Sequence, residues 1–121
     1  MGYDIATYAR NYERMVGHQV SYSEMVCNQF VLAVFRGVGL RIPDMRADDF
    51  ALSPHFRKVD TPQAGDLIHW PGHIGIVLDP DHGIFIGSQT RTGVAEANYK
   101  TGWWSGDFQG KTPDYFLRYV G

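Results

Sequence analysis

The fold is decided by residues 66–88, which read DLIHWPGHIGIVLDPDHGIFIGS. Three short segments of this stretch are rich in Ile, Val and Phe, which favour β-strands; they are residues 66–70, 73–78 and 83–88. Pro71-Gly72 marks a tight turn between the first two segments, and residues 79–83 mark a second turn. Because such short turns join neighbouring antiparallel strands, the stretch predicts an antiparallel meander.

Upstream of this meander the apolar residues follow a helical period. In residues 4–16 they recur at i, i+3, i+4 and i+7, which predicts an amphipathic helix that ends at Gly17. A second helix is predicted from about residue 23 to residue 36, and its start is either Ser21 with Glu24, as a capping box, or Ser23. Apolar residues cover almost its whole circumference, so we expect it to be a buried central helix.

The downstream segments complete the predicted chain. We expect a short helix in residues 44–52, and a long aromatic loop in residues 89–113 that includes one short strand around residues 94–97. Residues 115–120 are expected to close the sheet as its last strand. Helices that precede an antiparallel sheet indicate an α+β fold, in which the N-terminal helices pack on a small sheet.

The composition is that of one globular domain. The chain has 121 residues, of which 44% are hydrophobic and 20% are charged, and this length can bury a core without disulfides. Its net charge of -2 argues against a general nucleic-acid binder and against a binder of anionic membranes. No apolar run approaches the roughly 18 residues needed for membrane insertion. The first 17 residues lack the apolar segment of a secretion signal.

Cys27 is the single cysteine, so disulfides within the chain and cysteine-built zinc sites are excluded. It falls in the early turns of the second predicted helix, where free backbone N–H groups and the helix dipole favour the nucleophilic thiolate. His73 is the candidate base, because it opens a strand directly after a tight turn and Gly75 leaves space beside its ring. The alternatives are that Cys27 is an inert core thiol and His73 a packed strand histidine.

A metal site would depend on further histidines. His69 and His73 could act as ligands with Asp66 or His82, but the Pro71-Gly72 turn separates the first pair and no helical spacing fixes their directions. The sequence therefore predicts no metal and no other cofactor. Asp66 is expected to bond backbone groups.

Three motifs, in this order, resemble the NlpC/P60 family of cysteine peptidases. Residues 27–31 (CNQFV) match a Cys-Ser-Gly-Phe-Val stretch, residues 64–67 (AGDL) a Pro-Gly-Asp-Leu strand, and residues 73–76 (HIGI) a His-Val-Gly-Ile strand. The resemblance covers about residues 21–85. It implies a papain-like fold, with residues 1–121 as a single catalytic domain, and it implies that Cys27 is the nucleophile and His73 the base.

The chain departs from the family pattern at two places. Val26 replaces the Asp that usually precedes the Cys, and residues 28–29 (Asn-Gln) replace the Ser-Gly that follows it. The family's third catalytic residue, often His, falls at Gly87, which cannot orient an imidazole. Gln89 shares the strand face of Gly87 and is favoured as the third residue, because an amide can hold the tautomer of the base. Ser88 and the lack of any third residue are the alternatives.

Aromatic side chains complete the expected site. The family carries a Tyr near the oxyanion, and Tyr22 matches it at five positions before Cys27, closer than usual, with a purely structural role as the alternative. The backbone N–H of Cys27 is the more general oxyanion donor. Trp103 and Trp104 would line a substrate groove between the Cys27 helix and the sheet, bordered by residues 89–113, or would form an aromatic lid over the sheet.

The resemblance implies a hydrolase that cuts amide bonds in peptidoglycan stem peptides, in the bacterial periplasm or cell wall. Because no export signal is present, the chain would be an antibacterial effector delivered by a dedicated machine such as type VI secretion, or part of a phage or larger secreted protein. An effector implies an immunity protein that plugs the groove. A catalytically silent wall-binding module and a thiol acyltransferase on the same fold are the alternatives.

Overall fold

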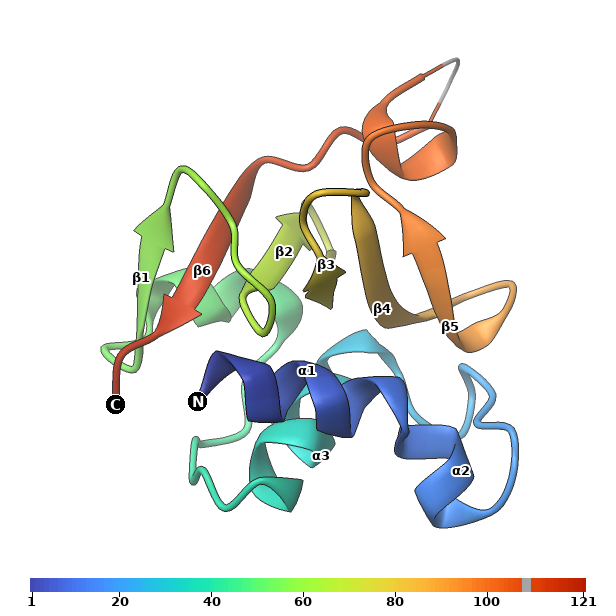
Figure 1. Ribbon diagram of the computed structural model, residues 1–121, viewed down its shortest axis with the longest axis vertical. Helices are drawn as coiled ribbons and strands as arrows, with labels where there is room; N and C mark the ends of the chain where they lie inside the picture. The colour runs from blue at the N-terminus through green and yellow to red at the C-terminus, as the bar shows by residue number, and fades with distance from the viewer. Residues whose placement is uncertain (108–109) are drawn as a thin grey trace.

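The computed structural model describes residues 1–107 and 110–121, and its centre is a six-stranded antiparallel sheet (Figure 1). The strand order across the sheet is β1-β6-β2-β3-β4-β5. The strands are β1 (Phe56–Val59), β2 (Leu67–Trp70), β3 (His73–Asp79), β4 (Ile84–Gln89), β5 (Gly93–Asn98) and β6 (Tyr115–Tyr119). The predicted meander is confirmed as β2, β3 and β4, and the predicted last strand as β6.

Three helices lie together on one side of the sheet (Figure 1): α1 (Gly2–Arg10), α2 (Tyr12–Val16) and α3 (Cys27–Gly37). The prediction of a single helix over residues 4–16 is wrong in one respect, because the helix is interrupted at Asn11. The side-chain amide of Asn11 donates to the carbonyl of Thr7. Gly17 ends α2 in the left-handed conformation, as predicted. Helix α3 packs on β3 and β4, so it is the buried central helix.

The predicted start of α3 is wrong by about one turn. Ser21 Oγ does accept a hydrogen bond from the N–H of Glu24, at 3.2 Å, but this bond closes a separate turn before the helix. The helix begins at Cys27, and the side-chain oxygen of Gln29 accepts the N–H of Val26 at 2.9 Å. Cys27 is therefore the first residue of α3 rather than a residue of its second turn.

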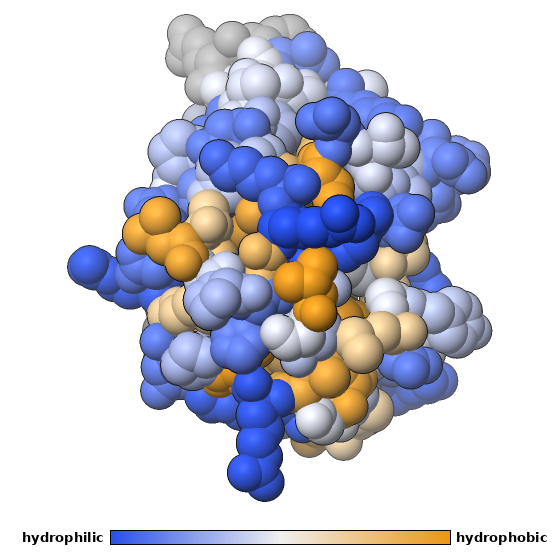
Figure 2. All heavy atoms as spheres, turned by 90° about the vertical axis from the view of Figure 1, so that its left-hand side faces the viewer, coloured by the Kyte–Doolittle hydropathy of each residue, from blue (hydrophilic) through white to orange (hydrophobic). Residues whose placement is uncertain are grey.

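The remaining elements are two 3₁₀ helices and two further strands. The short helix predicted over residues 44–52 is a 3₁₀ helix, η1 (Ala47–Leu52), and strand β1 was not predicted. The aromatic loop contains β5 and a second 3₁₀ helix, η2 (Trp103–Ser105), while residues 108–109 of that loop lie outside the described residues. On the face toward β1, charged side chains are interspersed with apolar ones (Figure 2).

The core consists of two clusters, one on each face of the sheet. The larger cluster joins the helices to the sheet and includes Cys27 and Phe30. The smaller cluster covers the opposite face and contains Ile68, Trp70, Val77, Phe85 and Tyr99. Helices on one face of an antiparallel sheet confirm the expected α+β, papain-like fold. Among the described residues, no helix is both long and apolar enough to cross a bilayer.

Candidate active site

Cys27 lies at the N-terminal end of α3 with 5% of its surface exposed. Burial raises the pKa of its thiol, while the backbone N–H groups of Ile74, Asn28 and Cys27 itself act in the opposite direction. The expectation of a thiol whose pKa is lowered by the helix terminus is therefore wrong, because burial outweighs the backbone amides. The contact with Ile74 sets the thiol beside the residue that follows His73 in β3.

The imidazole of His73 is bound by Gln89. Nε2 of His73 lies 3.2 Å from Oε1 of Gln89, and the amide nitrogen of Gln89 donates to the carbonyl of Ala95 at 3.0 Å. The carbonyl of Ala95 can only accept, so the amide NH₂ faces it and the amide oxygen faces His73. An amide oxygen also can only accept, so Nε2 of His73 carries the hydrogen and Nδ1 keeps a free lone pair.

Glycine at position 87 makes this arrangement possible. A Cβ atom at Gly87 would lie 2.5 Å from Oε1 of Gln89, so any side chain there would displace the amide. Gly87 pairs with Ala95 of β5, whose carbonyl holds the amide of Gln89. Gly87 and Gln89 are thus parts of one arrangement.

Two indoles enclose the imidazole. Trp104 stacks on His73 with 4.7 Å between ring centroids and 21° between planes, and Trp70 lies at 5.5 Å. His73 is 6% exposed, and this burial lowers the pKa of its imidazole to about 4, with a smaller contribution in the same direction from the charge of Lys111. His73 is therefore neutral at pH 7 and ready to accept a proton on Nδ1.

His69 binds two aspartates and so helps to fix the β2–β3 turn, a role that the sequence did not indicate. Its Nε2 lies 2.8 Å from Oδ1 of Asp48 and its Nδ1 2.7 Å from Oδ1 of Asp114, while its ring stacks on Tyr115 at 4.4 Å. The same oxygen of Asp48 accepts the N–H of Gly72, directly before His73, at 2.8 Å. We call Asp48, His69 and Asp114 the turn brace, because they fix the β2–β3 turn. The described residues contain no group of side chains arranged to hold a metal ion.

The other predicted site residues lie as follows. The hydroxyl of Ser88 donates to the carbonyl of Met25 rather than to His73, so it ties β4 to the segment before Cys27. Tyr22 is half-buried in the turn that precedes α3. Within residues 1–107 and 110–121, no hydrogen bond joins the thiol of Cys27 directly to His73. Such bonds are often long before a substrate binds.

The unusual residues around Cys27 have structural partners. The side-chain amide of Asn28 donates to the carbonyl of Met45 at 2.9 Å, which ties the start of α3 to the segment before η1. Gln29 accepts the N–H of Val26, as described above. The departures from the family pattern at these positions therefore stabilise the helix start that carries the thiol.

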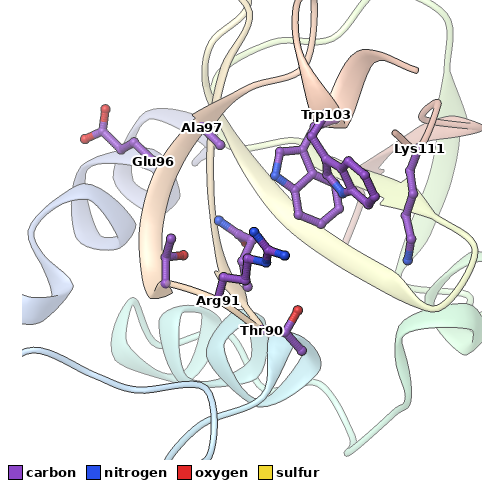
Figure 3. A pocket seen from close by; sticks show the side chains of 9 residues that line it. Thr90, Arg91, Glu96, Ala97, Trp103 and Lys111 are labelled. Atoms are coloured by element: carbon purple, nitrogen blue, oxygen red, sulfur yellow. The ribbon is translucent and has the colours of Figure 1, made fainter. Parts of the chain in front are cut away.

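The structure contains a pocket of about 420 Å³ (Figure 3). It differs from the groove expected between the Cys27 helix and the sheet, because it lies between the β4–β5 turn and the segment that holds both predicted tryptophans. Its lining residues are Gln89, Thr90, Arg91, Thr92, Glu96, Ala97, Trp103, Trp104 and Lys111. Gln89 and Trp104, which contact His73, form part of its wall.

Comparison with known proteins gives one family. The model of the NlpC/P60 family matches residues 11–112, which include α3 and strands β1 to β5. None of the curated proteins compared with the chain matches it.

Proposed function

The chain belongs to the NlpC/P60 family, whose members are generally cysteine peptidases and amidases of the cell wall, and we propose that it hydrolyses amide bonds in peptidoglycan stem peptides through Cys27 and His73. The chemistry would be acyl transfer through a thioester. The wall peptide is the expected partner, and the bacterial periplasm or cell wall the place of action.

One observation carries the proposal: Oε1 of Gln89 lies 3.2 Å from Nε2 of His73, which favours the tautomer that a general base needs. With the hydrogen on Nε2, the lone pair on Nδ1 is available to a thiol. The thiol of Cys27 lies against the backbone of Ile74, the next residue of β3. We therefore expect the thiol and the imidazole to meet at the N-terminal end of β3 when substrate is bound.

The mechanism follows from these positions. Nδ1 of His73 takes the proton from the thiol while the sulfur of Cys27 attacks the carbonyl carbon. The backbone N–H of Cys27, at the helix start, stabilises the oxyanion. The imidazolium then gives its proton to the amide nitrogen, the C–N bond breaks, and the amine leaves. Water attacks the thioester and loses a proton to Nδ1, the C–S bond breaks to release the carboxylic acid, and the sulfur of Cys27 takes the proton back from the imidazolium. Because the pKa of Cys27 is raised and that of His73 is about 4, the resting pair is a neutral thiol and a neutral imidazole.

The test is digestion of purified sacculi followed by mass spectrometry of the released fragments. The wild-type protein should release peptide fragments, and Cys27→Ala should release none. Gln19→Ala is the control, because Gln19 is exposed in the segment between α2 and α3; it should retain most of the activity. Equal products from the wild type and Cys27→Ala, or none from either, would contradict the proposal.

A second candidate is a silent wall-binding module on the same fold. It is favoured by one observation, the burial of both Cys27 and His73. This alternative predicts that the wild type and Cys27→Ala are both retained on sacculi and that neither releases fragments.

Delivery as an antibacterial effector, for example by type VI secretion, remains part of the proposal. An immunity protein would then bind over the pocket beside His73 and block access to the imidazole. Coexpression of the protein in the periplasm with and without a neighbouring gene product tests this: growth arrest that depends on Cys27 and is relieved by the second protein supports it.

A further inference from the structure

The pocket beside His73 carries two cations that the proposed mechanism does not use. Arg91, in the β4–β5 turn, and Lys111 lie on different sides of the Trp103 ring (Figure 3). Neither of them forms an ion pair with another described residue. Glu96 is the one acid of the lining, and its carboxylate points away from Arg91 (Figure 3). The lining therefore has a net positive charge.

The pocket adjoins the imidazole of His73. Gln89 and Trp104 line the pocket, and both also contact the imidazole of His73. The charge of Lys111 acts on His73 as well. In the proposed mechanism His73 delivers a proton to the leaving amine, whereas the oxyanion lies at Cys27. Gln89 binds Nε2 of His73, whereas the proposed proton transfers use Nδ1, so the pocket adjoins the imidazole on the side away from the reacting nitrogen.

We propose that this pocket binds a carboxylate of the substrate that lies outside the scissile amide. The guanidinium of Arg91 can bind both carboxylate oxygens in a bidentate pair, and the ammonium of Lys111 adds a point charge. The indoles offer flat apolar surface to the carbon chain that carries the carboxylate. The inference rests on the proposed function in taking a stem peptide as the ligand, and it adds a requirement for a free carboxylate.

The experiment is a binding titration of the Cys27→Ala variant, which cannot turn over a bound peptide by the proposed route. The probes are a synthetic stem tetrapeptide, L-Ala–γ-D-Glu–diaminopimelate–D-Ala, and the same peptide with its carboxylates converted to amides. Binding is followed by tryptophan fluorescence, because Trp103 and Trp104 line the pocket. The free acid should bind about tenfold more tightly than the amide form, as expected for a charge-assisted hydrogen bond, and this preference should shrink at high salt.

Variants connect the preference to the pocket. Arg91→Gln in the Cys27→Ala background should abolish the preference for the free acid, and Lys111→Gln should reduce it. Arg57→Gln is the matched control, because Arg57 is exposed on β1, at the opposite edge of the sheet; it should preserve the tenfold ratio. The inference would be overturned if the Cys27→Ala protein bound the two peptides with equal affinity. It would also be overturned if Arg91→Gln weakened the binding of both peptides by the same factor.

The two proposals fail in different ways. If the wild type cleaves the peptide but shows no charge preference, the pocket inference is wrong and the hydrolase proposal stands. If binding shows the preference and the wild type cleaves nothing, the hydrolase proposal is wrong and the pocket is the ligand site of a binding module.

Discussion

Gln89 decides which nitrogen of His73 carries the hydrogen, and this is the residue on which the proposed chemistry depends most. Its amide is oriented from both ends, by the carbonyl of Ala95 and by the imidazole. In papain-like sites an amide in this position is sufficient, because its task is to hold the tautomer and the ring.

We predict that Gln89→Ala lowers kcat on a stem peptide by about 10- to 100-fold, since the ring is no longer held in the reactive orientation. Gly87→Ala should act in the same direction, because its Cβ would lie 2.5 Å from Oε1 of Gln89. Both changes act through one hydrogen bond, so the double variant should be no worse than the more impaired single variant. Steady-state kinetics on the three variants check this.

The control for these variants is Gln19→Ala, at an exposed glutamine, which should leave kcat unchanged. Additive losses of kcat in the double variant would show that the two changes do not act through the same hydrogen bond. Full activity of Gly87→Ala would contradict the prediction as well.

The low pKa of His73 predicts a loss of stability in acid. Burial lowers this pKa from 6.5 to about 4. Between these values the unfolded chain binds the proton and the folded chain does not, so the free energy of unfolding falls as the pH falls through this window. The shift corresponds to about 3 kcal/mol. From pH 7 to pH 4 the wild type should therefore lose about this much more stability than His73→Gln, measured by urea unfolding; equal losses would contradict the buried neutral imidazole.

At the scale of elements, the turn brace joins η1 to the start of β3. Asp48 accepts the N–H of Gly72 and also binds His69, so a 3₁₀ helix fixes the turn from which the candidate base projects. The N–H of Gly72 first, and then His69, hold the pKa of Asp48 below its usual range. The turn brace therefore contributes fully to the free energy of unfolding at pH values above the ordinary pKa of an aspartate. This contribution is lost as the pH falls through the lowered pKa of Asp48.

We predict that Asp48→Ala lowers kcat several-fold with little change in KM, because it loosens the β2–β3 turn without removing a group that touches the substrate. The nuclear magnetic resonance signals of the His73 ring should shift in the same variant. Asp49→Ala is the control, since Asp49 lies in the same 3₁₀ helix and its nearest cation, Arg46, is 3.8 Å away. Unchanged His73 signals in Asp48→Ala would show that the brace does not position the imidazole.

The elements that the sequence predicted well are those whose apolar residues are buried on both faces. Strands β2, β3 and β4 carry nearly continuous apolar runs between tight turns, so their bounds were predicted within one residue. Strand β1 was missed because its two central residues, Arg57 and Lys58, are exposed and charged, as is common on an edge strand. The start of α3 was misplaced because the side chain that accepts a backbone N–H at its first turn is that of a glutamine, Gln29, and not that of a serine.

The candidate site was only partly predictable from the sequence, and the reason is the distance in sequence between its parts. Gln89 could be proposed because side chains alternate along a strand, which puts it on the face of Gly87. The turn brace joins residues 48, 69 and 114, and no local pattern connects positions so far apart. Arg91 and Lys111 likewise become a pair only through the fold.

At the scale of the whole molecule, one buried ion pair joins the C-terminal strand to the start of β2. Arg118 donates to both carboxylate oxygens of Asp66, at 3.0 and 2.7 Å, and Asp66 also accepts the N–H of Gln63, which confirms its expected bond to the backbone. The carboxylate is buried, so removing its partner leaves an uncompensated charge.

We predict that Arg118→Met lowers the free energy of unfolding by about 3 kcal/mol, the usual cost of breaking a buried pair on one side. Arg57→Met, on the exposed edge strand, should change it by less than about 0.5 kcal/mol. Urea unfolding monitored by tryptophan fluorescence measures both. Equal effects of the two substitutions would mean that the ion pair does not stabilise the sheet.

The most direct test of amide hydrolysis through Cys27 is to incubate the wild type with a stem peptide in ¹⁸O-labelled water and to analyse the products by mass spectrometry. Hydrolysis through a thioester predicts one labelled oxygen in the new carboxyl group, and no product from Cys27→Ala. Products formed by Cys27→Ala at the rate of the wild type, or products from the wild type whose new acyl end carries an amine instead of labelled oxygen, would contradict it.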